Sequence, residues 1–253
     1  MNGVVGLETP RSGLLLPAPR KLVEREPGRA FPRVRIGHVP VDLGRLDEVL
    51  RSIEGLVSGG QGGYVLTPDV EQVARAEHDA ALRESLARAE LSLAGGPALV
   101  RVARVIGSPL KEAMPGAEWL RALAGLASAR AWRVLVVAER PGVAEWAACA
   151  LRERHGLLAV GVAAPGVPGD GRGPWVDRLL ERIALTRPDL VLVSLDTPKQ
   201  ELFCQHAAAR LQPAVLVGLG TALESLLDGR RKSRARWVRR SLAFLRALVA
   251  ARR

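Results

Sequence analysis

The residues best suited to ligand binding follow apolar segments of the chain. Residues 197–201 (TPKQE) come directly after such a segment. At a helix start, Lys199 and Gln200 could hold a diphosphate or sugar hydroxyls, because free backbone N–H groups and a cation favour anions there. A plainer interpretation is that Pro198 and Glu201 begin a helix, since proline fits the first turn and an acid suits the helix dipole. Residues 197–201 alone leave both interpretations open.

The elements that must position these residues alternate along the chain. Continuous apolar runs predict buried strands at 63–67, 133–138, 157–162, 189–195 and 214–218. Helices are predicted at 70–89, 97–106, 117–129, 141–154, 175–186 and 199–210, with further helices to the C-terminus. This alternation predicts an α/β fold with a parallel sheet and helices on both faces. Ligands of such sheets bind at the carboxyl ends of the strands, so residues 197–201 fall where a ligand is expected.

The net charge of +11 is concentrated at the C-terminus. Residues 229–253 contain ten Lys and Arg and no acid, so the other residues carry only +1. We predict a flexible lead-in at 1–33, one α/β domain at 34–228 and a basic amphipathic helical tail at 229–253. The near-neutral body argues against nucleic-acid binding, and the tail favours a local anionic partner. No apolar run reaches the roughly 18 residues of a membrane-spanning helix, and no histidine pair has zinc-ligand spacing.

Several segments together resemble the WecG/TagA/CpsF glycosyltransferase family. The run VLVSLDTPKQE is similar to that family's strand–loop–helix signature, which ends in Pro-Lys-Gln-Glu. Further similarities cover about residues 34–250. They lie at 35–42, which is similar to the family's opening strand, and at 67–73, 141–145, 218–220 and 232–237. The resemblance implies a Rossmann-like fold and transfer of an N-acetylmannosamine-type sugar from a UDP donor to a polyprenyl-diphosphate-linked acceptor. It also implies that the basic C-terminal segment engages a membrane surface.

The resemblance assigns roles to individual residues. The expected catalytic residues are Thr67 and Asp69, with Asp69 as the expected general base. The expected substrate-binding residues are Lys199, Gln200, Glu224, Gly95, Gly96 and Gly220. The expected membrane or acceptor contacts are Arg234, Arg236, Trp237, Arg239 and Arg240. No resident metal is expected, although a divalent cation could accompany the UDP-sugar. We expect a cytoplasmic protein that lies at the inner face of the membrane. It could also self-associate.

The chain departs from the family pattern at ligand-facing positions. The family's Pro-Asp-Gly aspartate, its candidate general base, aligns with Gly95, which cannot accept a proton. The arginine of its Arg-Val-x-Gly motif aligns with Ala113. Glu139 and Asp196 replace glycines and would repel a diphosphate unless a nearby cation such as Lys199 offsets them.

Two functions therefore stay open, and a third is weaker. The first is an active glycosyltransferase with a modified site. The second is a degenerate family member that keeps the fold and acts as a regulatory or scaffolding partner in polysaccharide assembly. The third is an unrelated nucleotide or nucleic-acid binder, which the basic tail alone suggests. The chain shows neither aromatic–basic interleaving nor a helix-turn-helix pattern in support of the third.

Overall fold

A computed structural model of the chain describes residues 23–110, 112–220 and 222–223. The predictions for the first part of the lead-in and for the basic tail lie outside these residues. So do the roles predicted for Glu224, Arg234, Arg236, Trp237, Arg239 and Arg240.

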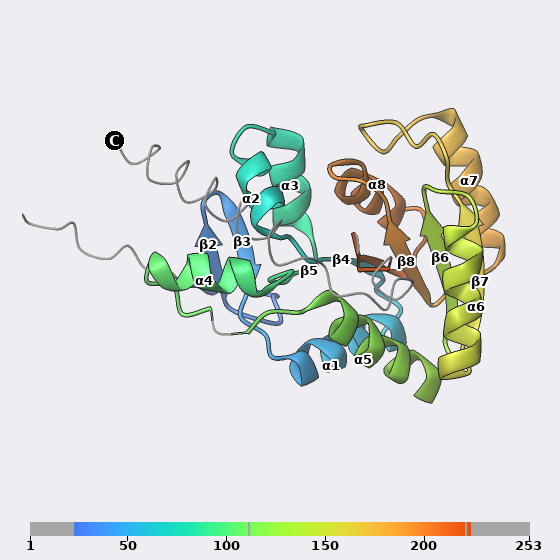
Figure 1. The fold of residues 1–253 in the computed structure, drawn as a ribbon, viewed down its shortest axis with the longest axis horizontal. Coiled ribbons are helices and arrows are strands. Elements are labelled where there is room, and N and C mark those ends of the chain that lie inside the picture. The colour runs from blue at the N-terminus through green and yellow to red at the C-terminus, as the bar shows by residue number, and fades with distance from the viewer. Residues whose placement is uncertain (1–22, 111, 221, 224–253) are drawn as a thin grey trace, which may run out of the picture.

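A six-stranded parallel sheet forms the centre of the molecule (Figure 1). Its strand order is β5-β4-β9-β8-β6-β7. The bounds are β4 (Gly63–Leu66), β5 (Leu91–Ser92), β6 (Arg133–Ala138), β7 (Leu158–Ala163), β8 (Leu190–Ser194) and β9 (Val215–Gly218). Each of the five strands predicted from apolar runs is present, and each pairs in parallel with its neighbours. The predicted α/β class is confirmed.

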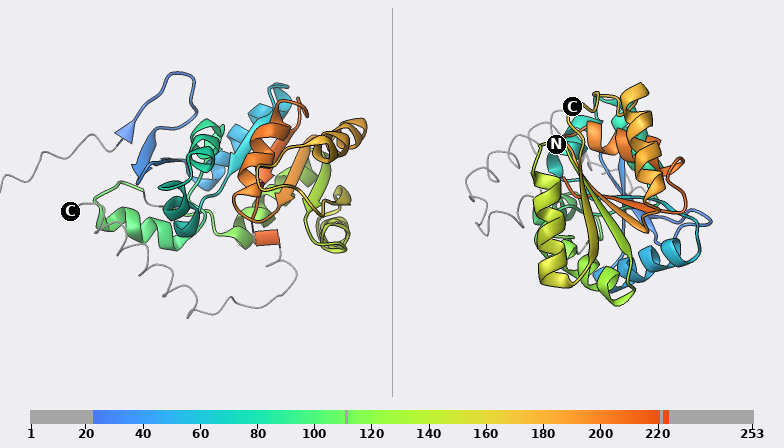
Figure 2. Two further views of the ribbon diagram at one scale, coloured as in Figure 1. Left: turned by 90° about the horizontal axis from the view of Figure 1, so that it is seen from above. Right: turned by 90° about the vertical axis from the view of Figure 1, so that its right-hand side faces the viewer.

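Helices cover both faces of this sheet (Figure 2). One layer contains α2 (Val70–Ala76), α3 (Ala80–Arg88), α7 (Pro174–Leu185) and α8 (Lys199–Ala208), with α4 (Pro97–Val105) beside them. The other contains α1 (Leu46–Ser58), α5 (Gly116–Ala129) and α6 (Val143–His155). Along β6, Leu135 and Val137 belong to the first core, whereas Val134 and Val136 belong to the second. The fold is therefore Rossmann-like, as the family resemblance implied.

A small antiparallel sheet lies beside the main one and corrects two expectations. It contains β1 (Val23–Glu24), β2 (Arg33–Ile36) and β3 (Val39–Asp42). Residues 35–42, expected as one strand, form part of a hairpin, because Gly37 adopts a φ of +62° and reverses the chain. Residues 23–33, which we expected in a flexible lead-in, contribute β1 and the start of β2 to this sheet.

The single helix predicted over residues 70–89 is two helices in the structure. The first ends at Ala76, and α3 begins at Ala80. Asp79 separates them by capping α3, because its side chain accepts a hydrogen bond from the backbone N–H of Leu82 at 3.0 Å. An aspartate at this position favours a new helix start over continuation of the old helix.

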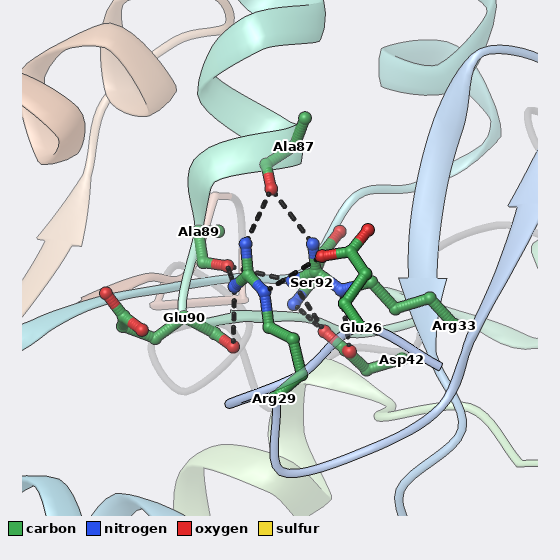
Figure 3. A network of polar contacts seen from close by, with 8 residues as sticks. All are labelled: Glu26, Arg29, Arg33, Asp42, Ala87, Ala89, Glu90 and Ser92. Atoms are coloured by element: carbon green, nitrogen blue, oxygen red, sulfur yellow. Dashed lines mark hydrogen bonds and ion pairs between the residues drawn. The ribbon is translucent and has the colours of Figure 1, made fainter. Parts of the chain in front are cut away.

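A buried ion pair fastens the small sheet to the main one (Figure 3). Arg33 and Asp42 are 2% and 3% exposed, and Arg33 Nε donates to Asp42 Oδ1 at 2.9 Å. The same guanidinium donates to the carbonyl oxygens of Ala87 and Ala89, at 2.9 and 2.8 Å, where α3 ends. The other carboxylate oxygen of Asp42 accepts from the N–H of Ser92 in β5 at 2.6 Å. Burial raises the pKa of Asp42, while hydrogen bonds and charge from Arg33 favour its ionised form.

Replacing Arg33 with Met should therefore destabilise the fold by about 3–5 kcal/mol, because it leaves the Asp42 carboxylate buried without its partner. Arg35 offers a matched control on the same strand, since its ion pair with Glu24 is exposed. Arg35→Met should change the free energy of unfolding by less than about 1 kcal/mol. Urea denaturation of both variants measures the difference, and equal effects would contradict this role for the buried pair.

Candidate functional site

The predicted site residues gather at one edge of the main sheet. We call this the carboxyl edge: the carboxyl ends of β4, β5, β6, β8 and β9 with the loops that follow them. The sheet order places the loop after β9 between those after β4 and β8. Thr67, Gly220 and Lys199 therefore follow three neighbouring strands, so the fold brings these three positions to the same edge.

The loop after β9 is held by side chains from both neighbouring strands. Thr67 Oγ1 donates to the carbonyl oxygen of Gly218 at 3.2 Å, and Ser194 Oγ donates to that of Gly220 at 2.8 Å. Gln200 Oε1 accepts from the N–H of Gly220 at 2.7 Å, and Gln200 is only 2% exposed. These contacts show that Thr67 and Gln200 shape the loop. A direct contact of either residue with substrate stays a prediction.

The charges at the carboxyl edge are partly balanced within the chain. Lys199 forms an ion pair with Glu139, and both side chains are partly buried. Asp196, the other acid that replaces a family glycine, is exposed. Lys199 therefore offsets the charge of Glu139, one of the two carboxylates that would repel a diphosphate. The same ion pair also engages Lys199, the residue that we expected to bind the diphosphate.

Asp69 is exposed and caps helix α2. Its Oδ1 accepts from the N–H groups of Glu71 and Gln72, at 2.9 and 3.0 Å. In return, Gln72 Oε1 accepts from the N–H of Asp69 at 2.8 Å, which completes a capping box. This role explains an aspartate at this position without any reference to catalysis. Both hydrogen bonds from the helix go to Oδ1.

Gly95 and Gly96 differ in the space around them. A Cβ atom at Gly95 would overlap the carbonyl oxygen of Thr67 and lie 2.9 Å from that of Pro68. At Gly96, no atom of residues 23–110, 112–220 or 222–223 other than those of its chain neighbours lies within 4 Å of such a Cβ. The backbone therefore excludes any side chain at the position where the resemblance puts the family's aspartate.

Gly95→Ala should consequently destabilise the protein by about 1–3 kcal/mol, because rigid backbone atoms would have to move. Gly96→Ala is the matched control and should have little effect, since it fills open space and its backbone is extended. Thermal or urea unfolding distinguishes the two. If Gly95→Ala were as stable as Gly96→Ala, the close approach of Gly95 to the backbone of Thr67 and Pro68 would be contradicted.

Ala113, where the family has an arginine, lines a cavity of about 170 Å³. Glu112 and Glu118 also line this cavity. Two acids in place of a cation would repel an anionic group such as a diphosphate.

Glu201 has an environment that the sequence did not indicate. The sequence suggested only that this acid suits the helix dipole, and the structure shows that Glu201 is 1% exposed. Its Oε1 accepts from Gln72 Nε2 at 2.5 Å, from Gln200 Nε2 at 3.3 Å and from Thr197 Oγ1 at 3.4 Å. Its Oε2 is buried and has no hydrogen-bond partner within the part of the chain that the structure describes. Burial raises the pKa of Glu201 to about 7. The hydrogen bonds to its side chain favour the ionised form and only partly oppose this effect.

This pKa predicts how stability depends on pH. Glu201 binds its proton more tightly in the folded state than in the unfolded state. Its contribution to stability therefore falls as pH rises from about 4.5, the ordinary value, through about 7. The shift corresponds to about 3 kcal/mol. Compared with Glu201→Gln, which cannot ionise, the native protein should lose stability over this range.

Thermal midpoints measured between pH 5 and 8.5 test this prediction. Glu84→Gln, at an exposed position on α3, is a control that should follow the native profile. Parallel pH profiles for the native protein and Glu201→Gln would contradict it.

The sequence profile of the glycosyl transferase WecG/TagA/CpsF family matches residues 34–243. The chain belongs to this family. Two relatives are each described as an N-acetylglucosaminyldiphosphoundecaprenol N-acetyl-beta-D-mannosaminyltransferase. The one from Staphylococcus aureus (strain NCTC 8325 / PS 47) is 24% identical over 190 residues, which cover 71% of this chain and 71% of the relative. The one from Bacillus spizizenii (strain ATCC 23059 / NRRL B-14472 / W23) is 25% identical over 190 residues, which cover 75% of this chain and 72% of the relative.

Family membership does not by itself assign the site residues. Gly95, Ala113, Glu139 and Asp196 remain departures from the pattern that the resemblance implied.

Among the described residues, no helix has both the length and the apolar character needed to cross a bilayer. A divalent cation bound together with a diphosphate stays a prediction.

Proposed function

We propose that this chain binds a UDP-sugar at the carboxyl edge. It then transfers an N-acetylmannosamine-type sugar to a polyprenyl-diphosphate-linked acceptor in cell-surface polysaccharide synthesis. The observation that supports this most is the family match over residues 34–243, which spans every loop of that edge. The names of the two relatives supply the substrate classes.

The proposed reaction needs a base for the acceptor. A hydroxyl group of the acceptor attacks the anomeric carbon of the donor sugar, the bond to UDP breaks, and the hydroxyl proton must leave. Asp69 is the candidate base because it is an exposed carboxylate at the carboxyl edge. The α2 N–H groups hold Oδ1, so the proton would go to Oδ2.

The diphosphate of the donor would lie near the start of α8. Lys199 can turn from Glu139 toward a phosphate, and a divalent cation can offset the carboxylates of Glu139 and Asp196. The glycine backbone at Gly96 and Gly220 leaves room for close approach, since among the described residues no atom beyond the chain neighbours lies within 4 Å of a Cβ built at either position.

The acceptor fixes the proposed location of the protein. A polyprenyl-linked acceptor lies in the membrane, so the chain would act from the cytoplasm at the inner face. The ten cations of residues 229–253 would provide electrostatic attraction to an anionic leaflet, about 1 kcal/mol for each cation near the surface. Self-association stays a further prediction.

The geometry at Gly95 favours a second candidate function. The backbone there excludes a carboxylate side chain, and Thr67, Gln200 and Lys199 are engaged in contacts within the chain. A family member of this kind could bind the donor without transferring it and act as a regulatory or scaffolding partner in polysaccharide assembly.

The Asp69→Asn variant distinguishes catalysis from capping. Asparagine caps a helix as well as aspartate does, so the thermal midpoint should stay close to the native value. Loss of the base should slow transfer from UDP-N-acetylmannosamine to N-acetylglucosaminyldiphosphoundecaprenol by about 100-fold or more.

Asp79→Asn is the matched control, because Asp79 caps the next helix in the same way. It should leave the transfer rate unchanged. Native-like transfer by Asp69→Asn would rule out Asp69 as the base, and a folded native protein that binds UDP without transfer would establish the second function.

A further inference from the structure

One buried carboxyl group connects three loops of the carboxyl edge. The side-chain N–H groups of Gln72 and Gln200 both donate to Glu201 Oε1. The amide oxygen of Gln72 accepts from the N–H of Asp69, in the loop after β4. The amide oxygen of Gln200 accepts from the N–H of Gly220, in the loop after β9. Glu201 therefore sets the orientation of two side-chain amides, and each amide holds one loop.

The loop after β8 joins the same network. Thr197 Oγ1 donates to Glu201 Oε1 at 3.4 Å and accepts from Gln72 Nε2 at 3.0 Å. The backbone of Glu201 is itself anchored, because its carbonyl oxygen accepts from the Ser85 hydroxyl of α3 at 2.7 Å. Since the main chain is fixed in this way, the carboxyl group has little freedom to leave its three donors.

We propose that Glu201 is a positioning residue that orders the three loops while it carries a proton, and that losing this proton loosens the carboxyl edge. Its three donors, Gln72, Thr197 and Gln200, are all uncharged. An ionised Glu201 would share its negative charge between Oε1, which has three donors, and Oε2, which is buried and has no partner among the described residues. A buried charge without a partner is relieved only if water enters or if the surrounding groups move.

The elements packed around Glu201 carry other titratable and charged groups. Burial raises the pKa values of Tyr64 on β4 and Cys204 on α8, so both groups stay protonated around neutral pH. On α2, Arg75 donates to the carbonyl oxygen of Thr197 at 3.0 Å. On α3, Glu84 and Arg88 pair with each other at the surface. Within the network of Glu201 and its three uncharged donors, Glu201 is the group that titrates, with a pKa of about 7.

Hydrogen exchange of individual backbone amides tests the proposal without any ligand. The amides of Asp69 and Gly220 report the loops after β4 and β9, and the amide of Leu93, bonded to Leu66, is a reference within the sheet. After correction for the chemical exchange rate, protection at Asp69 and Gly220 should fall about tenfold between pH 6 and pH 8.5, relative to Leu93. An unchanged ratio would overturn the proposal.

Two variants separate positioning from a general loss of structure. Glu201→Gln should show the same relative protection at both pH values, because it cannot ionise, whereas Glu84→Gln should behave as the native protein. Gln72→Ala removes the hydrogen bonds of Gln72 to Asp69, Thr197 and Glu201 but leaves the bond between Gln200 and Gly220, so Asp69 should lose protection at both pH values while Gly220 keeps it. If Glu201→Gln showed the same pH response as the native protein, Glu201 would not be the titrating group.

The consequence for ligand binding rests on the proposed function. UDP titrated by calorimetry should bind the native protein at least about fivefold more weakly at pH 8.5 than at pH 6, and Glu201→Gln should lack this dependence. If UDP bound the folded protein at neither pH, the proposed function would fail, while the exchange measurement would still decide the role of Glu201. Native binding that does not change with pH would contradict the effect of Glu201 on the ligand site.

Discussion

Glu201 shares one buried carboxyl oxygen among three uncharged donors, and the arrangement of the carboxyl edge depends on this sharing. A parallel sheet brings its loops to one edge but does not fix their conformations. Here Gln72 and Gln200 link Glu201 to the loops. The side-chain amide of each donates to Glu201, and its oxygen accepts a hydrogen bond from the backbone of a loop. The charged pair of Arg33 and Asp42 acts at a different place, where it fastens the small sheet to α3 and β5.

This use of polar groups affects both candidate functions. Side chains that the family resemblance assigns to substrate also hold the protein's own loops, so a ligand would meet a surface that is already organised. Such preorganisation favours binding, because fewer groups must be ordered when the ligand arrives. Preorganisation alone does not supply a base for the transfer reaction. The two functions consequently differ only in whether Asp69 can accept a proton while it caps α2.

The fold followed from the sequence wherever local patterns decided it. Continuous apolar runs such as residues 133–138 predicted buried parallel strands, and they are present. The turn at Gly37 and the helix break at Asp79 were missed, because each stretch was taken as one element although residues 37–38 and 77–79 interrupt its apolar positions. The burial of Glu201 could not be predicted, since its partner Gln72 lies 129 positions away and nothing near residue 201 indicates that contact. The steric limit at Gly95 also depends on a neighbouring loop.

The claim shared by both functions is that the carboxyl edge binds a UDP-sugar. The thermal midpoint of the purified protein, with and without UDP or UDP-N-acetylmannosamine and with and without Mg²⁺, tests it most directly. A ligand at about 100 times its dissociation constant stabilises the folded state by about 2.7 kcal/mol, so we predict a clear rise in the midpoint. A protein that melts cooperatively at the same temperature with every UDP species would contradict the account.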